Sequence, residues 1–238
     1  MSEDTMTITI DGKSVPAKPG QTIMEAADEA GVYIPRLCYH EGLPPGGHCR
    51  LCTVNVNGRP VSACTFPADE GQVIENDTEE LNARRRTIVE MLFVEGNHYC
   101  PACETSGNCE LQAIAYRLGL VTPQLPYLRV AHELDASHKD IYIDRDRCIL
   151  CGLCIRASKL LDGKTVFGFE GRGIHKSISV DAQHTLSEAE MAATDEAAKI
   201  CPTGCLVLKR HGYEVPVGHR TYDHSPIGSD IEQKQRAG

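Results

Sequence analysis

The chain of 238 residues has no tryptophan and only four phenylalanines, so it has few large side chains with which to fill a single hydrophobic core. Its longest apolar runs, such as Met91 to Val94, are far too short to span a membrane. The first residues are acidic and lack the basic start and apolar segment of a signal peptide. We therefore expect a cytoplasmic protein made of several small modules.

Positive charge is also scarce: the chain has 24 Lys and Arg against 33 Asp and Glu, which gives a net charge of −9. This balance argues against a nucleic-acid partner. The densest basic run, Arg84-Arg85-Arg86, is interpreted as the solvated face of a helix, with partner docking as the alternative. No glycine-rich phosphate loop follows an expected strand, and no Ser-His-Asp or paired-carboxylate arrangement stands out. We expect no nucleotide, flavin or substrate-converting site in this chain.

Cysteine, by contrast, is abundant, with twelve residues that fall into three groups. In a reducing compartment clustered thiols indicate metal ligands rather than disulfides. Metal binding can also stabilise modules that are too small for a sufficient apolar core. The grouping therefore predicts a modular α+β protein that contains one metal site per group.

The first group lies in a segment with the element order of a β-grasp domain. Alternating apolar residues flank Asp11-Gly12, which favours a type I′ hairpin turn, and a second hairpin is predicted to turn at Asn57-Gly58. Between the hairpins, Thr22 to Glu25 forms a capping box that opens a short helix. We assign residues 1–78 to this domain.

The four cysteines of this domain have the spacing C-x10-C-x2-C-x11-C and are Cys38, Cys49, Cys52 and Cys64. Plant-type [2Fe–2S] ferredoxins use a similar pattern with a shorter first interval. Here that interval holds a loop of turn-forming residues, 42–47, whose backbone N–H groups can approach the sulfurs. A zinc ribbon needs two CxxC knuckles, and only one is present. The spacing predicts a [2Fe–2S] cluster, with His48 interpreted as a surface residue rather than a donor to sulfur.

The second group sits between two amphipathic helices, predicted over residues 77–95 and 110–118. Its members are His98, Cys100, Cys103 and Cys109. Cys109 precedes the second helix, where the helix dipole favours a thiolate. Three cysteines and one histidine are also a normal structural zinc set, so the residue types alone leave zinc open. We assign residues 79–118 to a small helical domain around one metal centre.

The third group follows a linker, residues 119–137, that contains two prolines and shows no clear periodicity. Its spacing, C-x2-C-x2-C with a remote Cys-Pro, is the bacterial [4Fe–4S] pattern formed by Cys148, Cys151, Cys154 and Cys201. Ser158 stands where a two-cluster ferredoxin has a further cysteine, so one cubane is expected. Cys205 is left over and is interpreted as a small buried residue.

A ferredoxin-like α+β domain is expected over residues 138–208. Strands are predicted at 165–169, 176–180 and 206–208, and a capping box at Ser187 and Glu190 predicts a helix that reaches Lys199. The remaining tail, residues 209–238, is polar and should be mostly disordered by itself. The alternative is an arm that docks on a partner through its apolar residues Tyr213, Val215, Val217 and Tyr222.

The order of the three groups resembles the N-terminal cluster-bearing region of the large peripheral iron–sulfur subunit of respiratory complex I, over residues 5 to about 208. In most of that family the histidine of the middle group stands four residues before the first cysteine. Here Gly96 occupies that place, and His98 stands two residues before Cys100. The stretch Gly-Asn-His-x-Cys is similar to a variant in the diaphorase iron–sulfur subunits of soluble NAD-reducing [NiFe]-hydrogenases, and the short length agrees with it.

The resemblance implies that His98, Cys100, Cys103 and Cys109 hold a second [4Fe–4S] cluster. The implied cofactors are thus one [2Fe–2S] and two [4Fe–4S] clusters. The implied partners are a flavin and NAD-binding diaphorase subunit and the small and large subunits of a [NiFe]-hydrogenase. The chain would relay electrons between H2 and NAD in either direction. Open alternatives are the same relay in an NAD-linked formate dehydrogenase or complex I-like dehydrogenase, and a zinc-binding scaffold without a redox role.

Overall fold

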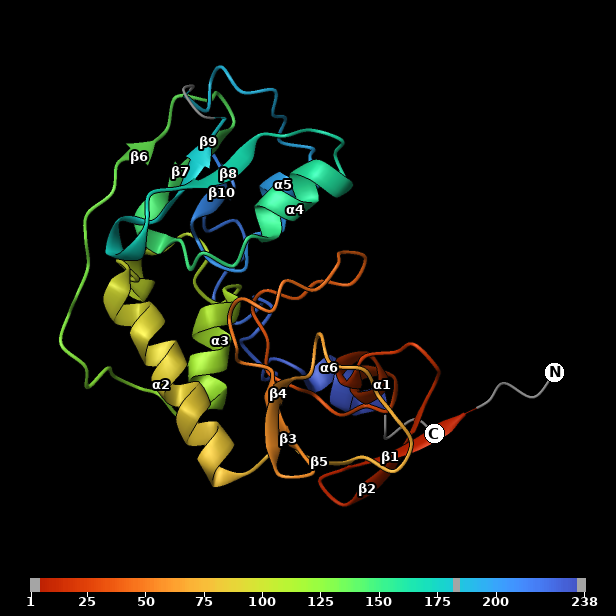
Figure 1. Cartoon of the computed structure of the whole chain (residues 1–238). Helices are drawn as coiled ribbons and strands as arrows, with labels where there is room; N and C mark the ends of the chain where they lie inside the picture. The colour runs from red at the N-terminus through yellow and green to blue at the C-terminus, as the bar shows by residue number, and fades with distance from the viewer. Residues whose placement is uncertain (1–4, 182–184, 235–238) are drawn as a thin grey trace.

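The computed structural model describes residues 5–181 and 185–234. Residues 1–4 of the first predicted domain, 182–184 with His184, and 235–238 of the predicted tail lie outside this description. Three regions are visible: a sheet at the bottom, a pair of helices at the left and a second set of strands and helices at the top (Figure 1). Within the described residues no helix is both long and apolar enough to cross a membrane.

The first region is a five-stranded sheet with one helix packed against it. Its elements are β1 (Met6–Ile10), β2 (Lys13–Ala17), α1 (Ile23–Glu29), β3 (Thr53–Val56), β4 (Arg59–Ser62) and β5 (Val73–Glu75). The strand order is β2-β1-β5-β3-β4, with β1 and β5 parallel and the other neighbours antiparallel. The predicted succession of hairpin, helix, cysteine loop and hairpin is confirmed.

Local sequence signals determine the turns and the helix start in this region. Asp11 and Gly12 have φ of 48° and 77°, and Asn57 and Gly58 have 48° and 80°, as two central turn residues of type I′ require. Thr22 accepts a hydrogen bond from the Glu25 N–H at 3.2 Å, and the Glu25 carboxylate accepts one from the Thr22 N–H at 2.7 Å. Both predicted hairpins and the predicted capping box are therefore confirmed.

The helix pair consists of α2 (Glu79–Glu95) and α3 (Glu110–Arg117), with a short 3-10 turn, η1 (Cys100–Ala102), between them. The predicted apolar stripes face the interior. Leu81 and Val89 of α2 are buried, and so are Leu111 and Ile114 of α3. The two helices share one apolar cluster with residues of the first region, so the helix pair and the sheet form a common core.

The prediction of a solvated basic face is wrong for Arg85. Arg84 and Arg86 are at the surface and pair with Glu80 and Glu79. Arg85 is only 2% exposed. It lies four residues after Leu81 and four before Val89, so helical periodicity places it on the buried stripe.

The third region combines a three-stranded antiparallel sheet, ordered β10-β7-β6, with the hairpin β8-β9 and two short helices. Its elements are β6 (Leu134–Asp135), β7 (Ile141–Asp144), η2 (Arg145–Arg147), α4 (Leu153–Leu160), β8 (Phe167–Glu170), η3 (Gly173–His175), β9 (Ser177–Val180), α5 (Glu196–Lys199) and β10 (Leu206–Leu208). The predicted strands are confirmed, and β6 lies in the segment predicted as a linker.

The predicted helix from Ser187 to Lys199 is wrong, because only its last turn, α5, is helical. The Glu188 carboxylate accepts from the N–H of Thr185 at 3.0 Å, two residues before the expected cap. Leu186 and Met191 are both buried, although residues five apart point about 140° apart around a helix. A bent path therefore buries both side chains where a straight helix would expose one.

The tail is ordered over its described residues rather than free. The Tyr222 N–H donates to the Gly107 carbonyl at 3.0 Å, and the Tyr213 hydroxyl donates to the Ala102 carbonyl at 2.7 Å. Further on, Ile227 is buried against α3, and a short helix, α6 (Ser229–Gln233), follows. Two of the four proposed partner anchors, the tyrosines, thus contact this same chain, whereas Val215 and Val217 remain exposed.

Candidate iron–sulfur sites

The four cysteines of the first group meet between the loop before β3 and the end of β4. The Cys52 and Cys64 sulfurs are 3.4 Å apart, because the Ala63 N–H extends the β3–β4 ladder by donating to the Cys52 carbonyl at 3.0 Å. The Cys49 N–H points at the Cys38 sulfur at 3.4 Å. Hydrogen bonds from the Cys49 thiol and from backbone N–H groups, including that of His48, lower the pKa of Cys38. Of the predicted loop 42–47, Gly47 directs its N–H at the Cys64 sulfur, as expected, and the His48 side chain is exposed.

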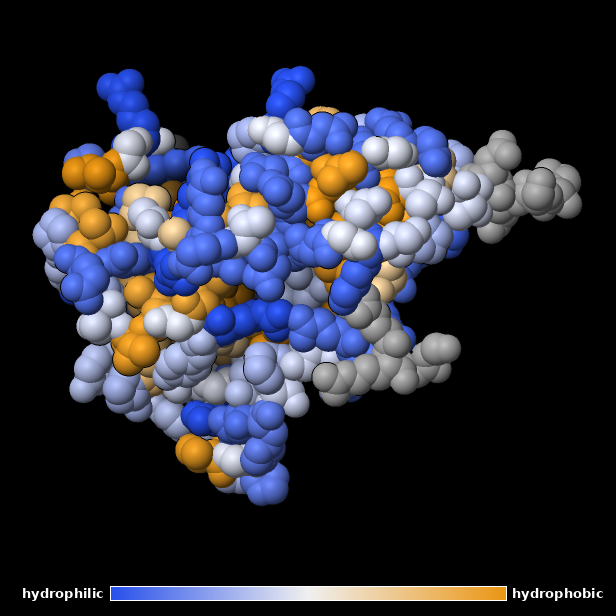
Figure 2. Space-filling model, turned by 90° about the horizontal axis from the view of Figure 1, so that it is seen from below, coloured by the Kyte–Doolittle hydropathy of each residue, from blue (hydrophilic) through white to orange (hydrophobic). Residues whose placement is uncertain are grey.

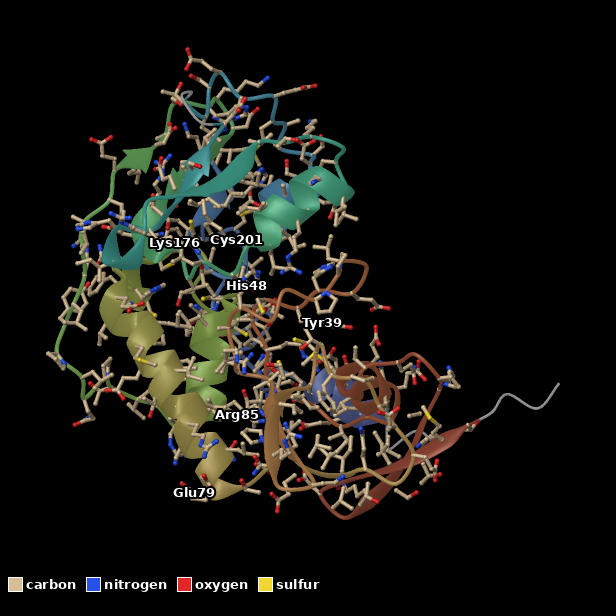
Figure 3. The ribbon with its side chains drawn as sticks, viewed as in Figure 1. Tyr39, His48, Glu79, Arg85, Lys176 and Cys201 are labelled. Atoms are coloured by element: carbon tan, nitrogen blue, oxygen red, sulfur yellow. The ribbon has the colours of Figure 1, made fainter. Side chains whose placement is uncertain are left out.

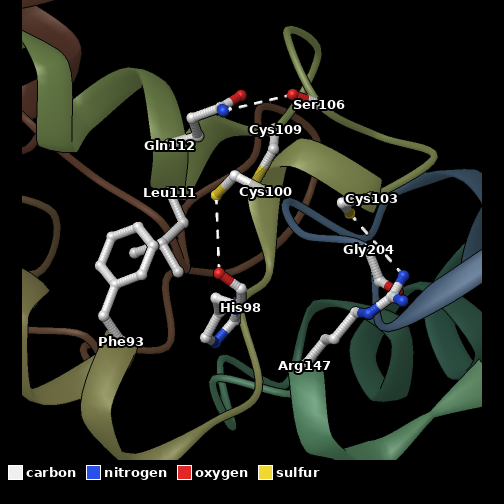
Figure 4. Close-up of a pocket in the computed structure, with 10 residues that line it drawn as sticks. All are labelled: Phe93, His98, Cys100, Cys103, Ser106, Cys109, Leu111, Gln112, Arg147 and Gly204. Carbon is white, nitrogen blue, oxygen red and sulfur yellow. Dashed lines mark hydrogen bonds between the residues drawn. The ribbon is translucent and has the colours of Figure 1, made fainter.

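The second group lines one cavity between η1, the start of α3 and η2 (Figure 4). All four predicted ligands, His98, Cys100, Cys103 and Cys109, are among its lining residues. Cys109 immediately precedes α3, and the N–H groups of Leu111 and Gln112 act to lower its pKa. Burial acts more strongly and raises that pKa to about 12. A bound metal cation would reverse this balance, since it deprotonates a coordinating thiol.

His98 has the features of a neutral metal-binding imidazole. Its Nε2 is buried and has no hydrogen-bond partner among the described residues. Buried polar atoms without a partner are uncommon, so this nitrogen is free for another ligand. Burial lowers the His98 pKa to about 4, the positive charge of Arg147 acts in the same direction, and a hydrogen bond with the Leu92 backbone opposes them. The ring is therefore neutral at physiological pH, which is the form that binds metals.

The position of His98 also accounts for its shifted place in the sequence. A Cβ atom on Gly96 would lie 2.6 Å from His98 Nε2 and 2.7 Å from the Asp146 carbonyl oxygen. A side chain at position 96 would therefore collide with both the ring and the backbone. The imidazole of His98 thus occupies the space beside Gly96, the position that holds the histidine in most of the complex I family.

The third group surrounds a cavity of the upper region. Cys148, Cys151, Cys154 and Cys201 line it together with Cys205. Gly152, with a φ of 68°, forms the turn between the second cysteine and α4, and the Leu150 N–H points at the Cys148 sulfur at 3.4 Å. The Cys205 thiol is buried and within hydrogen-bond reach of the Cys148 and Cys201 sulfurs. The structure thus agrees with a small buried residue at position 205.

The donor sets fit iron–sulfur clusters. Within residues 5–181 and 185–234 no three His, Cys, Asp or Glu side chains converge on a point as they would around a single ion. In a cluster each thiolate binds a different iron corner, so its ligands surround a volume rather than a point. The second and third groups each line one cavity, with their cysteines spread around it rather than gathered at one point.

The second and third sites are in direct contact. The Arg147 guanidinium is 3.7 Å from the Cys103 sulfur, and the next residue is Cys148. A Cβ atom on Gly204 would lie 2.9 Å from the same sulfur, so only glycine fits there. The Glu110 N–H, next to Cys109, donates to the Pro202 carbonyl at 3.0 Å, next to Cys201. The cysteine spacing did not point to Arg147, and its place directly before Cys148 was the available signal.

The first and third sites are also close. Arg156 of α4 donates to the Cys38 carbonyl at 2.5 Å. His48 Nε2 lies 3.8 Å from the position of a Cβ atom on Gly152. Figure 3 shows His48 on the part of the lower region that faces the upper region. Residues at the third site therefore contact residues of both other sites.

Apolar surface lies beside the second site. Seen from below, apolar patches interrupt the charged surface, most of them toward the left of the molecule (Figure 2). Exposed large apolar side chains of α2 and of the segment after α3 include Met91, Val121, Leu125 and Leu128. His98 and Cys100 also line an open groove next to this segment. The second site is thus the one next to an apolar groove at the surface.

Comparison with protein families divides the chain into three matching parts. A model of a 2Fe-2S iron-sulfur cluster binding domain matches residues 3–79. A second model, of the NADH-ubiquinone oxidoreductase-G iron-sulfur binding region, matches residues 85–123. A third model, of a 4Fe-4S single cluster domain, matches residues 141–208. The predicted modular α+β class and the set of one [2Fe–2S] and two [4Fe–4S] clusters are confirmed. The domain boundaries, such as 78/79 and 137/138, stay a prediction.

Individual relatives identify the family. The gamma subunit of the NAD-reducing hydrogenase HoxS of Cupriavidus necator is 40% identical over 217 residues, which are 91% of this chain and 92% of the relative. An NADH-quinone oxidoreductase subunit of Rickettsia felis is 33% identical over 87% of this chain but over only 31% of its own length. A crystal structure of an NAD+-reducing [NiFe]-hydrogenase in the H2-reduced state contains a chain that is 45% identical, with a TM-score of 0.92 and coverage of 97% of this chain and 98% of that one. The chain therefore belongs to the family of gamma subunits of NAD-reducing hydrogenases.

Proposed function

We propose that this chain is the electron-relay subunit of a hydrogen:NAD+ oxidoreductase. It passes electrons, in either direction, between a subunit that carries flavin and the NAD site and a [NiFe]-hydrogenase module with its small and large subunits. The observation that carries this proposal is the grouping of twelve ligand-type side chains in three sites, in a chain that aligns with 91% of its length to a hydrogenase gamma subunit. Iron–sulfur clusters supply one-electron transfer when bound. We place the complex in the cytoplasm.

Each ligand group has one proposed cluster. Cys38, Cys49, Cys52 and Cys64 hold the [2Fe–2S] cluster. The two [4Fe–4S] clusters are held by His98, Cys100, Cys103 and Cys109, and by Cys148, Cys151, Cys154 and Cys201.

The chain's own residues hold these sites close together. Arg147 contacts the Cys103 sulfur, and the Glu110 N–H binds the Pro202 carbonyl, so the second and third sites are joined twice. Arg156 of α4 joins the third site to the first through the Cys38 carbonyl. These contacts support an order in which the third site stands between the other two. The apolar groove beside the second site then lies at one end of the relay.

A similar relay in a complex I-like dehydrogenase or an NAD-linked formate dehydrogenase is the second candidate. The identity to the hydrogenase gamma subunit, 40%, exceeds the 33% to the NADH-quinone oxidoreductase relative. This difference favours the hydrogenase.

Metal analysis of the natively purified complex tests the proposal. We expect about ten irons for this chain, two plus four plus four, with matching acid-labile sulfide, and nickel and flavin in the partner subunits. Iron analysis of this chain prepared alone under anaerobic conditions measures its iron without that of the partner subunits. About six irons with only one cubane signal would remove one [4Fe–4S] assignment. Molybdenum in place of nickel would indicate that the chain belongs to a formate dehydrogenase. Zinc without acid-labile sulfide would indicate a zinc-binding scaffold.

A further inference from the structure

Arg85 is a buried cation surrounded by neutral acceptors. Its Nε donates to the Leu51 carbonyl at 3.0 Å, Nη2 to the Thr53 carbonyl at 3.0 Å and Nη1 to the Asn76 carbonyl at 2.7 Å. The side-chain oxygens of Asn76 and Asn82 accept two more hydrogen bonds, at 2.8 and 3.0 Å. Among the described residues no carboxylate lies within salt-bridge distance of this guanidinium. The charge is thus fully hydrogen-bonded but not neutralised.

A buried positive charge without a paired carboxylate is unfavourable unless some other negative group lies nearby. Burial lowers the Arg85 pKa to about 10, so the side chain still carries its charge at neutral pH. The negative groups that act on it are, in order, the Asp77 carboxylate, the Cys52 sulfur and the Asp11 carboxylate. Cys52 is the one member of this set that belongs to a proposed cluster.

Arg85 also holds the loop around that cysteine. The carbonyls of Leu51 and Thr53 lie on either side of Cys52 in the chain, and one guanidinium binds both. Figure 3 shows Arg85 on the lower part of α2, beside the first region and six residues after Glu79, where the helix begins. The helix pair therefore fixes the ligand loop of the first site through a charged side chain.

We propose that Arg85 is a positioning residue for the [2Fe–2S] cluster and that its buried charge raises the reduction potential of this cluster. Reduction adds one electron, and hence one negative charge, to the cluster. A fixed positive charge in a medium of low dielectric constant stabilises that reduced form more than the oxidised form. The inference rests on the proposed function, because it needs the [2Fe–2S] cluster at this site.

The variant Asn76→Asp separates charge from position. Aspartate has the shape of asparagine and keeps the oxygen that accepts from Arg85 Nη2, but it adds a carboxylate against the guanidinium and loses the 3.3 Å hydrogen bond from Nδ2 to the Tyr33 carbonyl. The hydrogen bonds to Leu51 and Thr53 remain. We expect the equilibrium constant for reduction of the [2Fe–2S] cluster to fall about tenfold, a shift of about 59 mV for one electron. The measurement is a redox titration of the [2Fe–2S] EPR signal in the purified complex.

Substitutions of Arg85 test the two roles separately. Arg85→Lys keeps the charge, but an ammonium group cannot reproduce the planar fork that binds two carbonyls, so we expect a less stable cluster with a potential close to wild type. Arg85→Met removes the charge as well, so the potential should fall as in Asn76→Asp. Arg84→Met and Arg86→Met are matched controls, because these arginines pair with glutamates at the surface, and neither should change the potential.

An unchanged potential in Asn76→Asp, with the cluster intact, would overturn the charge effect. Should Asn76→Asp not fold, equal potentials in Arg85→Lys and Arg85→Met would overturn it as well. An equal shift in Arg84→Met would show a general surface-charge effect and also overturn it. A wild-type complex without any [2Fe–2S] signal would instead contradict the proposed function, so the two failures are distinguishable.

Discussion

Replacing Cys151 with alanine is expected to remove the third cluster and to leave a chain that does not assemble with its partners. Cys151 is 8% exposed and belongs to the apolar core of the upper region, together with Leu153 and Phe167. The cluster is thus the centre of that core rather than an addition to its surface. Structural metal binding contributes on the order of 10 kcal/mol to the folding of small metal domains. This is comparable with the whole stability of a domain, about 5–15 kcal/mol.

The matched control is Cys205→Ala, the same substitution in the same core. Cys205 is 5% exposed but is a bystander in our assignment, so its loss should cost about 1 kcal/mol and leave every iron in place. Iron content and gel filtration of the variant chains, each produced with the partner subunits and purified anaerobically, would distinguish the two variants. We expect Cys151→Ala to lose about four irons and to elute as aggregate or free chain. If Cys205→Ala loses the cluster, or Cys151→Ala keeps it, the ligand assignment must be redrawn.

The parts of the fold that were predictable from sequence are those governed by neighbouring residues. The turns at Asp11-Gly12 and Asn57-Gly58 follow from side chains that tolerate positive φ, and the start of α1 follows from Thr22 and Glu25. The helix α3 has a clear apolar stripe, and α2 has one that Arg85 interrupts. In each case the decisive interaction spans only a few residues, so a local pattern is sufficient.

The incorrect predictions concern interactions between distant segments. Arg85 is buried because the carbonyls of a separate domain accept its hydrogen bonds, and three adjacent arginines in a sequence do not reveal this. The expected helix at Ser187 is replaced by a bend in which Asp195 pairs with Lys164, thirty-one residues away, at 2.7 Å. The tail is polar in composition, yet Ile227 finds a place against α3.

The candidate sites show the same division. The spacing of the cysteines was enough to group the ligands, and the structure brings each group together. The assignment of each ligand to iron stays a prediction. The residues that connect the sites, Arg147 above all, were not predicted, because their role depends on how the domains pack.

The second large effect is expected at His98. If its free Nε2 binds iron, His98→Ala should open one corner of the cubane and favour loss of that iron, which leaves a three-iron centre and about nine irons per chain. His98→Cys should keep the cluster, because a thiolate replaces the imidazole. The thiolate adds one negative charge, so the potential of that cluster should be lower than in the wild type. EPR-monitored redox titration of the purified complex measures both outcomes.

A suitable control is His138→Ala, which removes a buried histidine that belongs to none of the three ligand groups. His138 Nδ1 accepts from the Asp140 N–H at 3.1 Å, so its loss should lower stability without a change in iron content or in any potential. A structural role for His98 would give the same result as His138. Iron binding instead requires the three-iron signal in His98→Ala and the lowered potential in His98→Cys.

An intact cubane at unchanged potential in His98→Ala would show that the fourth ligand comes from another residue. Gly96 could not be that residue, since it has no side chain and a Cβ atom there would meet the Asp146 carbonyl.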